Sequence, residues 1–185
     1  CRDLESETSR ESIIGFTFSD GGHEFYVLTS ASWTWQYNKT TGRWFQRKSF
    51  NSDKWVGQFA FRLGNKTIIG GASGGKYYEL SSDAHDEAGS PLIWTLRSPP
   101  LHAYPNRISV DRLHLDFITG IGLNSTDTDE SAPVVGLRYS DDGSRSWSRQ
   151  RLGSLGAQGQ HQNRVTFNGL GTTGRQGRIW EIECA

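Results

Sequence analysis

Several protein classes need features that this sequence lacks. It has two cysteines and no methionine in 185 residues, which is too few cysteines for a disulfide framework or a structural zinc site. Lys and Arg together number 20, as do Asp and Glu, so it has no basic excess for charge-driven binding to nucleic acid or to an anionic membrane. No apolar run approaches the roughly 18 residues of a membrane helix. We therefore expect no membrane partner and at most weak contact with DNA.

Aromatic residues and glycine are abundant instead. The chain has seven Trp, nine Phe, six Tyr and 22 Gly. Aromatic side chains suit the pleated surface of a sheet, and glycine suits tight turns. The sequence therefore predicts an all-β protein. It begins with Cys1, and we expect it to be a fragment or a processed form of a longer chain. A disulfide between Cys1 and Cys184 and two free thiols both remain compatible with the sequence.

Short strand-like runs recur along the chain. Residues 1–12 are charged and polar and are expected to form a connector or tail. Residues 13–185 contain three groups of about four strands, within 13–49, 56–96 and 108–167, and a last strand at 177–184. This spacing is typical of antiparallel β-propeller blades, about three to four of them, and a closed propeller needs roughly four to eight. The sequence thus predicts part of a larger propeller, with a β-sandwich as the alternative.

The run 139–147, YSDDGSRSW, resembles an Asp box, a hairpin motif of the form Ser/Thr-x-Asp-x-Gly-x-Thr-Trp. Its aspartate accepts hydrogen bonds across a tight turn, and its tryptophan packs beneath. Ser144 stands at the position of the glycine in this pattern. The motif indicates a structural turn and no catalysis, and the expected turn residues are Ser140, Asp142, Ser146 and Trp147.

Longer segments resemble the packaged-DNA stabilisation protein of short-tailed bacteriophages. The resemblance spans about residues 13–184. It is carried by loosely specific patterns at 22–29 (GHEFYVLT), 74–80 (GGKYYEL), 111–117 (DRLHLDF), 137–143 (LRYSDDG) and 178–181 (RIWE).

The resemblance implies a structural virion protein of the phage tail, made in the host bacterial cytoplasm. Such a tail hub carries a β-propeller and assembles as a homo-oligomeric ring below the portal and its adaptor. It closes or extends the DNA channel, retains packaged DNA, and docks the tail needle and tailspikes. The resemblance brings no catalytic residues or cofactors.

Two carbohydrate-related alternatives remain. A sialidase-like glycosidase needs paired carboxylates or a tyrosine nucleophile, and too few blades are present to gather a sialidase's arginines, so we expect no enzyme. A carbohydrate-binding module needs exposed aromatic faces, for which Trp33, Trp35 and Trp44 are candidates. The candidate catalytic residues are Glu24, Asp53, Glu79, Asp116, Tyr77 and Tyr78.

The remaining polar clusters favour ordinary surface roles. The acidic stretches 83–87 and 127–130 lack the pattern of a calcium loop, and the glycine-rich run 70–75 lies between strands, so it predicts a hairpin turn rather than a phosphate site. We expect no metal and no cofactor. The scattered histidines are His23, His85, His102, His114 and His161, and the basic residues beside the turn are Arg145, Arg149 and Arg151.

Overall fold

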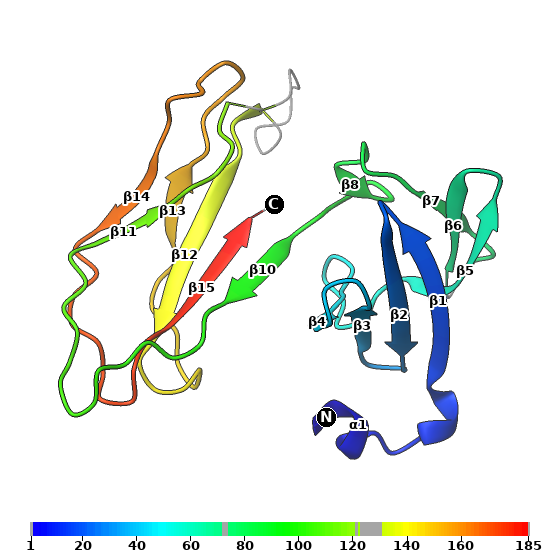
Figure 1. Ribbon diagram of the computed structural model, residues 1–185, viewed down its shortest axis with the longest axis horizontal. Helices are drawn as coiled ribbons and strands as arrows, with labels where there is room; N and C mark the ends of the chain where they lie inside the picture. Colours follow the sequence, from blue (N-terminus) through cyan, green and yellow to red (C-terminus); the bar gives the residue numbers. More distant parts are fainter. Residues whose placement is uncertain (1, 72–73, 121, 123–130, 185) are drawn as a thin grey trace. The chain divides into compact units, whose positions relative to one another are not determined.

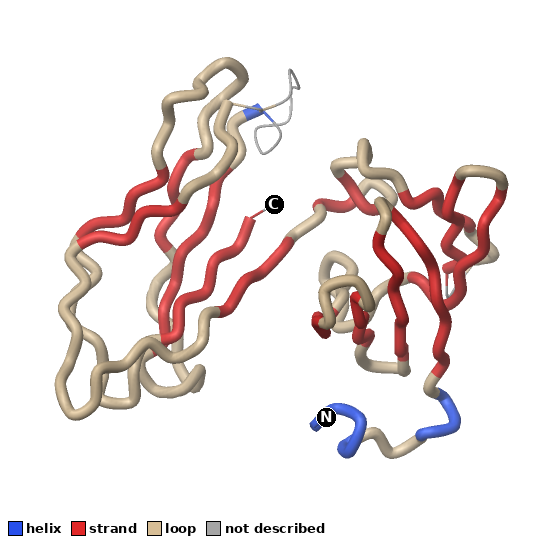
Figure 2. Tube along the Cα trace, viewed as in Figure 1, coloured by secondary structure: helices blue, strands red, loops and turns tan. Residues whose placement is uncertain are grey.

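The computed structural model describes residues 2–71, 74–120, 122 and 131–184. The chain divides into two compact units, Cys1–Leu92 and Ile93–Ala185. Strands dominate both units, and the α-helix α1 (Arg2–Ser6) and the 3₁₀ turn η1 (Arg10–Ser12) occupy the expected connector (Figures 1 and 2). The predicted all-β class is confirmed.

The first unit opens with a four-stranded antiparallel meander in the order β1-β2-β3-β4. The first predicted group of four strands therefore pairs in sequence order, because short turns join each strand to the next. The connector also contacts this sheet, since the indole Nε1 of Trp35 donates to Asp3 Oδ2 at 2.9 Å. The strands are β1 (Ile14–Asp20), β2 (His23–Thr29), β3 (Thr34–Asn38) and β4 (Arg43–Gln46).

A second sheet of the first unit has three strands in the order β5-β6-β7. The second predicted group, 56–96, therefore lacks its fourth strand here, because the end of that range falls in β10 (Trp94–Arg97) of the other unit. The strands of the sheet and of a short ribbon beside it are β5 (Gly57–Leu63), β6 (Lys66–Gly71), β7 (Tyr77–Leu80), β8 (Asp86–Glu87) and β9 (Ser90–Pro91).

The core of the first unit forms around Trp55. Phe18, Val27 and Ile69 are buried with it and come from both sheets. The guanidinium of Arg47 lies 3.8 Å from the centre of the Trp55 ring, a cation–π contact that lets a charged side chain close the core.

The two faces of β3 carry different kinds of side chain. Trp33 is buried just before the strand, but Trp35 and Tyr37 lie on the outer face and are half-buried. The inner face instead buries Thr34 and Gln36. Thr34 Oγ1 lies 2.8 Å from Thr29 Oγ1 and accepts the backbone N–H of Trp55 at 3.1 Å, so its burial is compensated by hydrogen bonds.

The second unit is a two-layer β-sandwich. One layer is a four-stranded sheet in the order β10-β15-β12-β13, and the other is the two-stranded β11–β14 (Figure 1). Its core contains residues of both layers, including Leu137 of β12, Phe167 of β14 and Trp180 of β15. The other strands of this unit are β11 (Arg112–Leu115), β12 (Val134–Ser140), β13 (Arg151–Ser154), β14 (Val165–Asn168) and β15 (Ile179–Cys184).

This strand order differs from a propeller blade. A blade is a meander of consecutive strands, whereas β15 lies between β10 and β12, and β11 pairs with β14. The third predicted group therefore does not form a blade: β12 and β13 pair as a hairpin, but β11 pairs with β14 in a separate sheet. The second unit instead has the β-sandwich form that the sequence left as its alternative.

Candidate functional site

The Asp142 turn, residues 140–147, joins β12 to β13. Its carboxylate accepts the backbone N–H groups of Arg145 and Ser146 at 3.0 and 2.9 Å, and the Ser146 hydroxyl at 2.6 Å. The Ser140 hydroxyl donates to Asp142 Oδ1 at 2.7 Å. The structure thus brings Ser140, Asp142 and Ser146 together, with both carboxylate oxygens engaged inside the turn.

These bonds favour the ionised form of Asp142. The Ser146 hydroxyl, the Ser146 backbone N–H and the Ser140 hydroxyl lower the pKa of Asp142 far below its ordinary value. A carboxylate so fully occupied is a poor general acid, because protonation would break its hydrogen bonds. The geometry of the turn is structural.

Ser144 takes the position where the motif has glycine, and it keeps the backbone shape of glycine. Its φ is +71°, in the left-handed region that favours glycine. Its backbone N–H donates to Ser140 Oγ at 2.9 Å. This hydrogen bond offsets part of the strain, so the turn forms without the glycine.

Trp147 lies over two arginines. The guanidinium carbons of Arg97 and Arg138 are 5.3 and 5.1 Å from the centre of its ring. Both arginines donate to Glu181 of β15, which stands opposite each of them in the neighbouring strands and is 1% exposed. Trp147 thus joins a cross-strand group of ion pairs.

Arg178 is a buried residue that the sequence analysis missed. Its Nε and Nη2 donate to the two oxygens of Asp141 at 2.8 and 2.7 Å, and Nη1 donates to the carbonyl of Leu170 at 2.5 Å. Its guanidinium carbon lies 3.8 Å from the centre of the Tyr139 ring. The hydrogen bond from Arg178 lowers the pKa of Asp141. Arg178 therefore ties the Asp142 turn to the start of the last strand. The arginine is 37 residues from Asp141, so local patterns gave no signal.

The candidate catalytic carboxylates form separate surface pairs. Glu24 bonds Lys39, Asp53 bonds Lys48 and Glu79 bonds Lys66, at 2.7 to 2.8 Å, and their side chains are exposed. Asp116 belongs to the second unit and lies 2.9 Å from His114. The lysines lower the pKa values of Glu24 and Asp53 through direct hydrogen bonds.

The candidate nucleophiles lie on opposite faces of β7. Tyr77 packs against Phe59 and Phe61, with ring centres 6.2 and 6.1 Å apart. Tyr78 is half-buried on the other face, opposite Ile69. Neighbouring positions along a strand point to opposite faces, so these tyrosines serve different surfaces.

The candidate sugar-binding tryptophans are also separated. Trp33 is buried, Trp35 donates to Asp3, and Trp44 is exposed on the edge strand β4. Of these three, Trp44 is therefore the residue whose ring faces solvent most openly.

The histidines and basic residues occupy separate sites. His23, His114 and His161 hydrogen-bond Asn38, Thr166 and the carbonyl of Thr119, respectively. His85, His102, Arg145 and Arg149 are exposed. Arg151 donates to the carbonyls of Asn168 and Gly169, so it bridges β13 to the end of β14.

The acidic and glycine-rich stretches have local roles where they are described. Glu87 of β8 accepts the indole N–H of Trp55 at 2.7 Å. The backbone N–H of Gly71 donates to the carbonyl of Lys76 at 3.0 Å, which closes the connection from β6 to β7. Ala72, Ser73, the acidic run 127–130 and Cys1 lie outside the described residues, whereas Cys184 is buried in the second core.

Within the described ranges, no group of three His, Cys, Asp or Glu side chains is placed to hold a metal ion. The same ranges contain no helix of sufficient length and apolar character to cross a membrane.

The sequence of the second unit relates it to a known family. Residues 93–179 match the family described as bacteriophage P22 Gp10, beta-sandwich. The match supports a structural tail protein of a short-tailed phage and agrees with the two layers seen in this unit. A place in the virion fits this relationship.

The comparisons with curated proteins and with solved structures add no argument about function. No curated protein matches the chain significantly. Among solved structures, an exo-beta-1,3-galactanase from Phanerochaete chrysosporium, determined with galactose, is 12% identical over 93% of this chain, with a TM-score of 0.28. The alignment covers 53% of that enzyme, so the chain spans about half its length. A TM-score this low carries no argument about fold or activity.

Proposed function

We propose that the chain is a non-enzymatic structural part of a phage tail hub. In this role it assembles as a ring below the portal and adaptor, helps to retain packaged DNA, and offers surfaces to the tail needle and tailspikes. The observation that carries the proposal is the match of residues 93–179 to the P22 Gp10 beta-sandwich family.

The use of polar side chains in the second unit supports a structural role. Arg178, Asp141, Glu181 and Asp142 bond to partners within the fold, and a catalytic group needs a position within reach of substrate. Ion pairs and a hydrogen-bonded turn that fix the fold suit a structural protein.

The charge balance supports passage of DNA through such a ring. With 20 basic and 20 acidic residues, the chain as a whole gains little from releasing phosphate counterions, so it has no strong general affinity for DNA. A channel wall of this kind lets DNA slide.

Assembly tests the proposal directly. The purified chain is mixed with portal–adaptor complex, and the mixture is examined by light scattering after size exclusion and by negative-stain microscopy. We expect additional ring-shaped density at the adaptor end of the complex. The control is the chain mixed with portal that lacks the adaptor, which should gain no density. A chain that stays monomeric and leaves the portal–adaptor complex unchanged at micromolar concentration contradicts the hub role.

Hydrolysis tests the non-enzymatic part. The full chain is incubated with fluorogenic sialoside and galactoside substrates beside Tyr77→Phe and Tyr78→Phe variants. We expect wild type and both variants to match the buffer blank. Turnover by the wild type that either substitution removes would overturn the proposal in favour of a glycosidase.

A further inference from the structure

Three aromatic rings form a row on the outer face of the first sheet. Tyr26 of β2 stands opposite Tyr37 of β3, and Tyr37 stands opposite Trp44 of β4. The Trp44 ring centre lies 5.0 Å from that of Tyr37 and 6.4 Å from that of Tyr26. Tyr26 and Trp44 are 40% and 50% exposed. The row crosses three strands, a span of about 10 Å.

Gly15 of β1 makes room for the first ring of this row. A Cβ added at Gly15 would lie 3.1 Å from the Tyr26 hydroxyl and 3.5 Å from its ring carbon Cε2. The Tyr26 side chain therefore lies along the sheet across β1. An aromatic ring laid along a sheet offers solvent a flat apolar surface.

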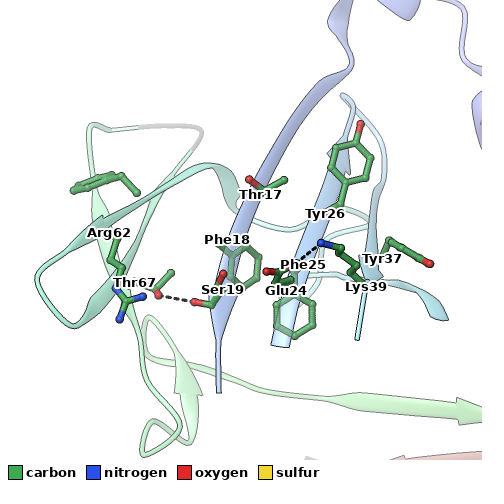
Figure 3. Close-up of a pocket in the computed structure, with 11 residues that line it drawn as sticks. Thr17, Phe18, Ser19, Glu24, Phe25, Tyr26, Tyr37, Lys39, Arg62 and Thr67 are labelled. Carbon is green, nitrogen blue, oxygen red and sulfur yellow. Dashed lines mark hydrogen bonds and ion pairs between the residues drawn. The ribbon is translucent and has the colours of Figure 1, made fainter. Parts of the chain in front are cut away.

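A groove of about 760 Å³ lies beside this row. Tyr26 and Tyr37 line it together with the Glu24–Lys39 ion pair, and Phe61, Arg62 and Thr67 line it from β5 and β6. Figure 3 shows Arg62 and Thr67 on one side and Tyr26, Tyr37 and Lys39 on the other. The Thr67 hydroxyl donates to the carbonyl of Ser19 at 3.0 Å, which fixes β6 to β1.

We propose that this groove and the row Tyr26–Tyr37–Trp44 bind an oligosaccharide. A sugar ring has an apolar C–H face, which packs on an aromatic ring, and hydroxyl edges, which bond charged and hydroxyl side chains. The groove supplies both kinds of surface side by side, and its volume lies within the roughly 300–1,000 Å³ of small-molecule sites. The length of the row favours a chain of sugars.

Two other ligand classes fit the groove less well. The buried centre of a protein interface is depleted of charged residues, whereas the Glu24–Lys39 pair lies in the groove with its side chains 60% and 72% exposed. Single-stranded nucleic acid also stacks on aromatic rings but needs a positive track. Here Glu24 offsets Lys39, so Arg62 is the remaining cation among the described lining residues, and one cation is no track. A saccharide is satisfied by a mixed pair of charges, which donates to some hydroxyls and accepts from others.

Calorimetric titration of the full chain tests the proposal. The probes are cellohexaose, chitohexaose and a delipidated bacterial O-polysaccharide, with oligo-dT as a nucleic-acid comparison. We expect saturable binding of at least one saccharide. Trp44→Ala and Tyr26→Ala should each weaken it about tenfold or more, the effect of losing one stacked ring, and Trp44→Phe should retain most of it.

A matched control lies in the same unit, outside the groove. Phe50 is 43% exposed, close to the exposure of Tyr26 and Trp44, and it does not line the groove. Phe50→Ala should leave saccharide affinity unchanged, and melting temperatures confirm that each variant is folded. The proposal is overturned if no saccharide binds saturably, if oligo-dT alone binds, or if Trp44→Ala and Phe50→Ala weaken binding equally.

The outcome is independent of the hub role. Saccharide binding uses the first unit, whereas the phage relationship comes from residues 93–179. Failure of the titration leaves ring assembly intact, and failure of assembly leaves the titration intact.

Discussion

Arg178 is 1% exposed, and its guanidinium donates hydrogen bonds to Asp141 and to the carbonyls of Leu170 and Thr172. A buried arginine is tolerated only where partners replace its water. The side chain thus closes the space between the Asp142 turn and the last strand. Its importance follows from burial together with bidentate geometry.

Replacing this arginine tests its role. Arg178→Met leaves the Asp141 carboxylate and two carbonyls without their donor, so we expect the free energy of unfolding of the second unit to fall by about 3–5 kcal/mol. Urea denaturation followed by tryptophan fluorescence measures the change. Arg149→Met, at an exposed position, is the control and should shift the midpoint little. Equal midpoints for both variants contradict the assignment.

The Asp142 turn predicts a dependence of stability on acid. The pKa values of Asp141 and Asp142 are lowered in the folded protein, whereas an unfolded aspartate titrates near 3.9. As pH falls below about 4, the unfolded chain therefore takes up protons first, and the second unit loses stability. Above that pH, the contribution of the two carboxylates to the stability of the second unit is fully present.

Thermal melts at pH 7, 4, 3 and 2 measure this loss. The melting temperature of the wild type should fall steeply below pH 4. Asp142→Asn should already melt lower at pH 7, by on the order of 5 °C, and should show a flatter acid profile. Parallel pH profiles for the two proteins would show that the turn does not carry the dependence.

At the scale of elements, Gly70 of β6 leaves space for an aromatic ring of the neighbouring strand β5. A Cβ at Gly70 would lie 2.1 Å from Phe59 Cζ on the neighbouring strand, too close for any side chain. Phe59, Phe61 and Tyr77 pack above this position. The missing side chain therefore lets an aromatic ring lie over the middle strand.

Substitution of this glycine should disturb the aromatic cover. We expect Gly70→Ala to destabilise the first unit by about 1–3 kcal/mol, because the Phe59 ring must leave its place. The double variant Gly70→Ala/Phe59→Leu should recover part of the loss in chemical denaturation. A Gly70→Ala protein as stable as wild type contradicts the close packing.

The last strand, β15, is an interior strand of the four-stranded sheet in the second unit. β15 lies between β10 and β12 and faces Arg97 and Arg138 with the buried Glu181. The strand predicted at 177–184 is close to the observed Ile179–Cys184. Its position inside the sheet was not predicted, because period-2 alternation identifies a strand without naming its partners.

At the scale of the molecule, the division at Leu92 and Ile93 predicts two folding units. Each has its own buried cluster, around Trp55 in the first and around Leu137 and Trp180 in the second. A unit with its own core can fold alone.

Separate expression tests this division. Residues 1–92 and 93–185 should each give a cooperative thermal transition, and Arg178→Met should lower only the transition of the second fragment. Circular dichroism and calorimetry measure both. A fragment 93–185 that is unfolded at 20 °C while the full chain is folded contradicts the division.

The sequence by itself determined the all-β class, the first hairpins and the hydrogen-bonding residues of the Asp142 turn, because these depend on residues close together in the chain. Among the described residues, the hydrogen-bond donors to the Asp142 carboxylate lie within four positions of it. Only the tertiary structure decided that β10 leaves the first unit, that β15 enters the second sheet, and that Arg178 reaches Asp141 across 37 positions. Strands with similar aromatic patterns can pair in many ways, and the choice among them is made by how whole faces pack.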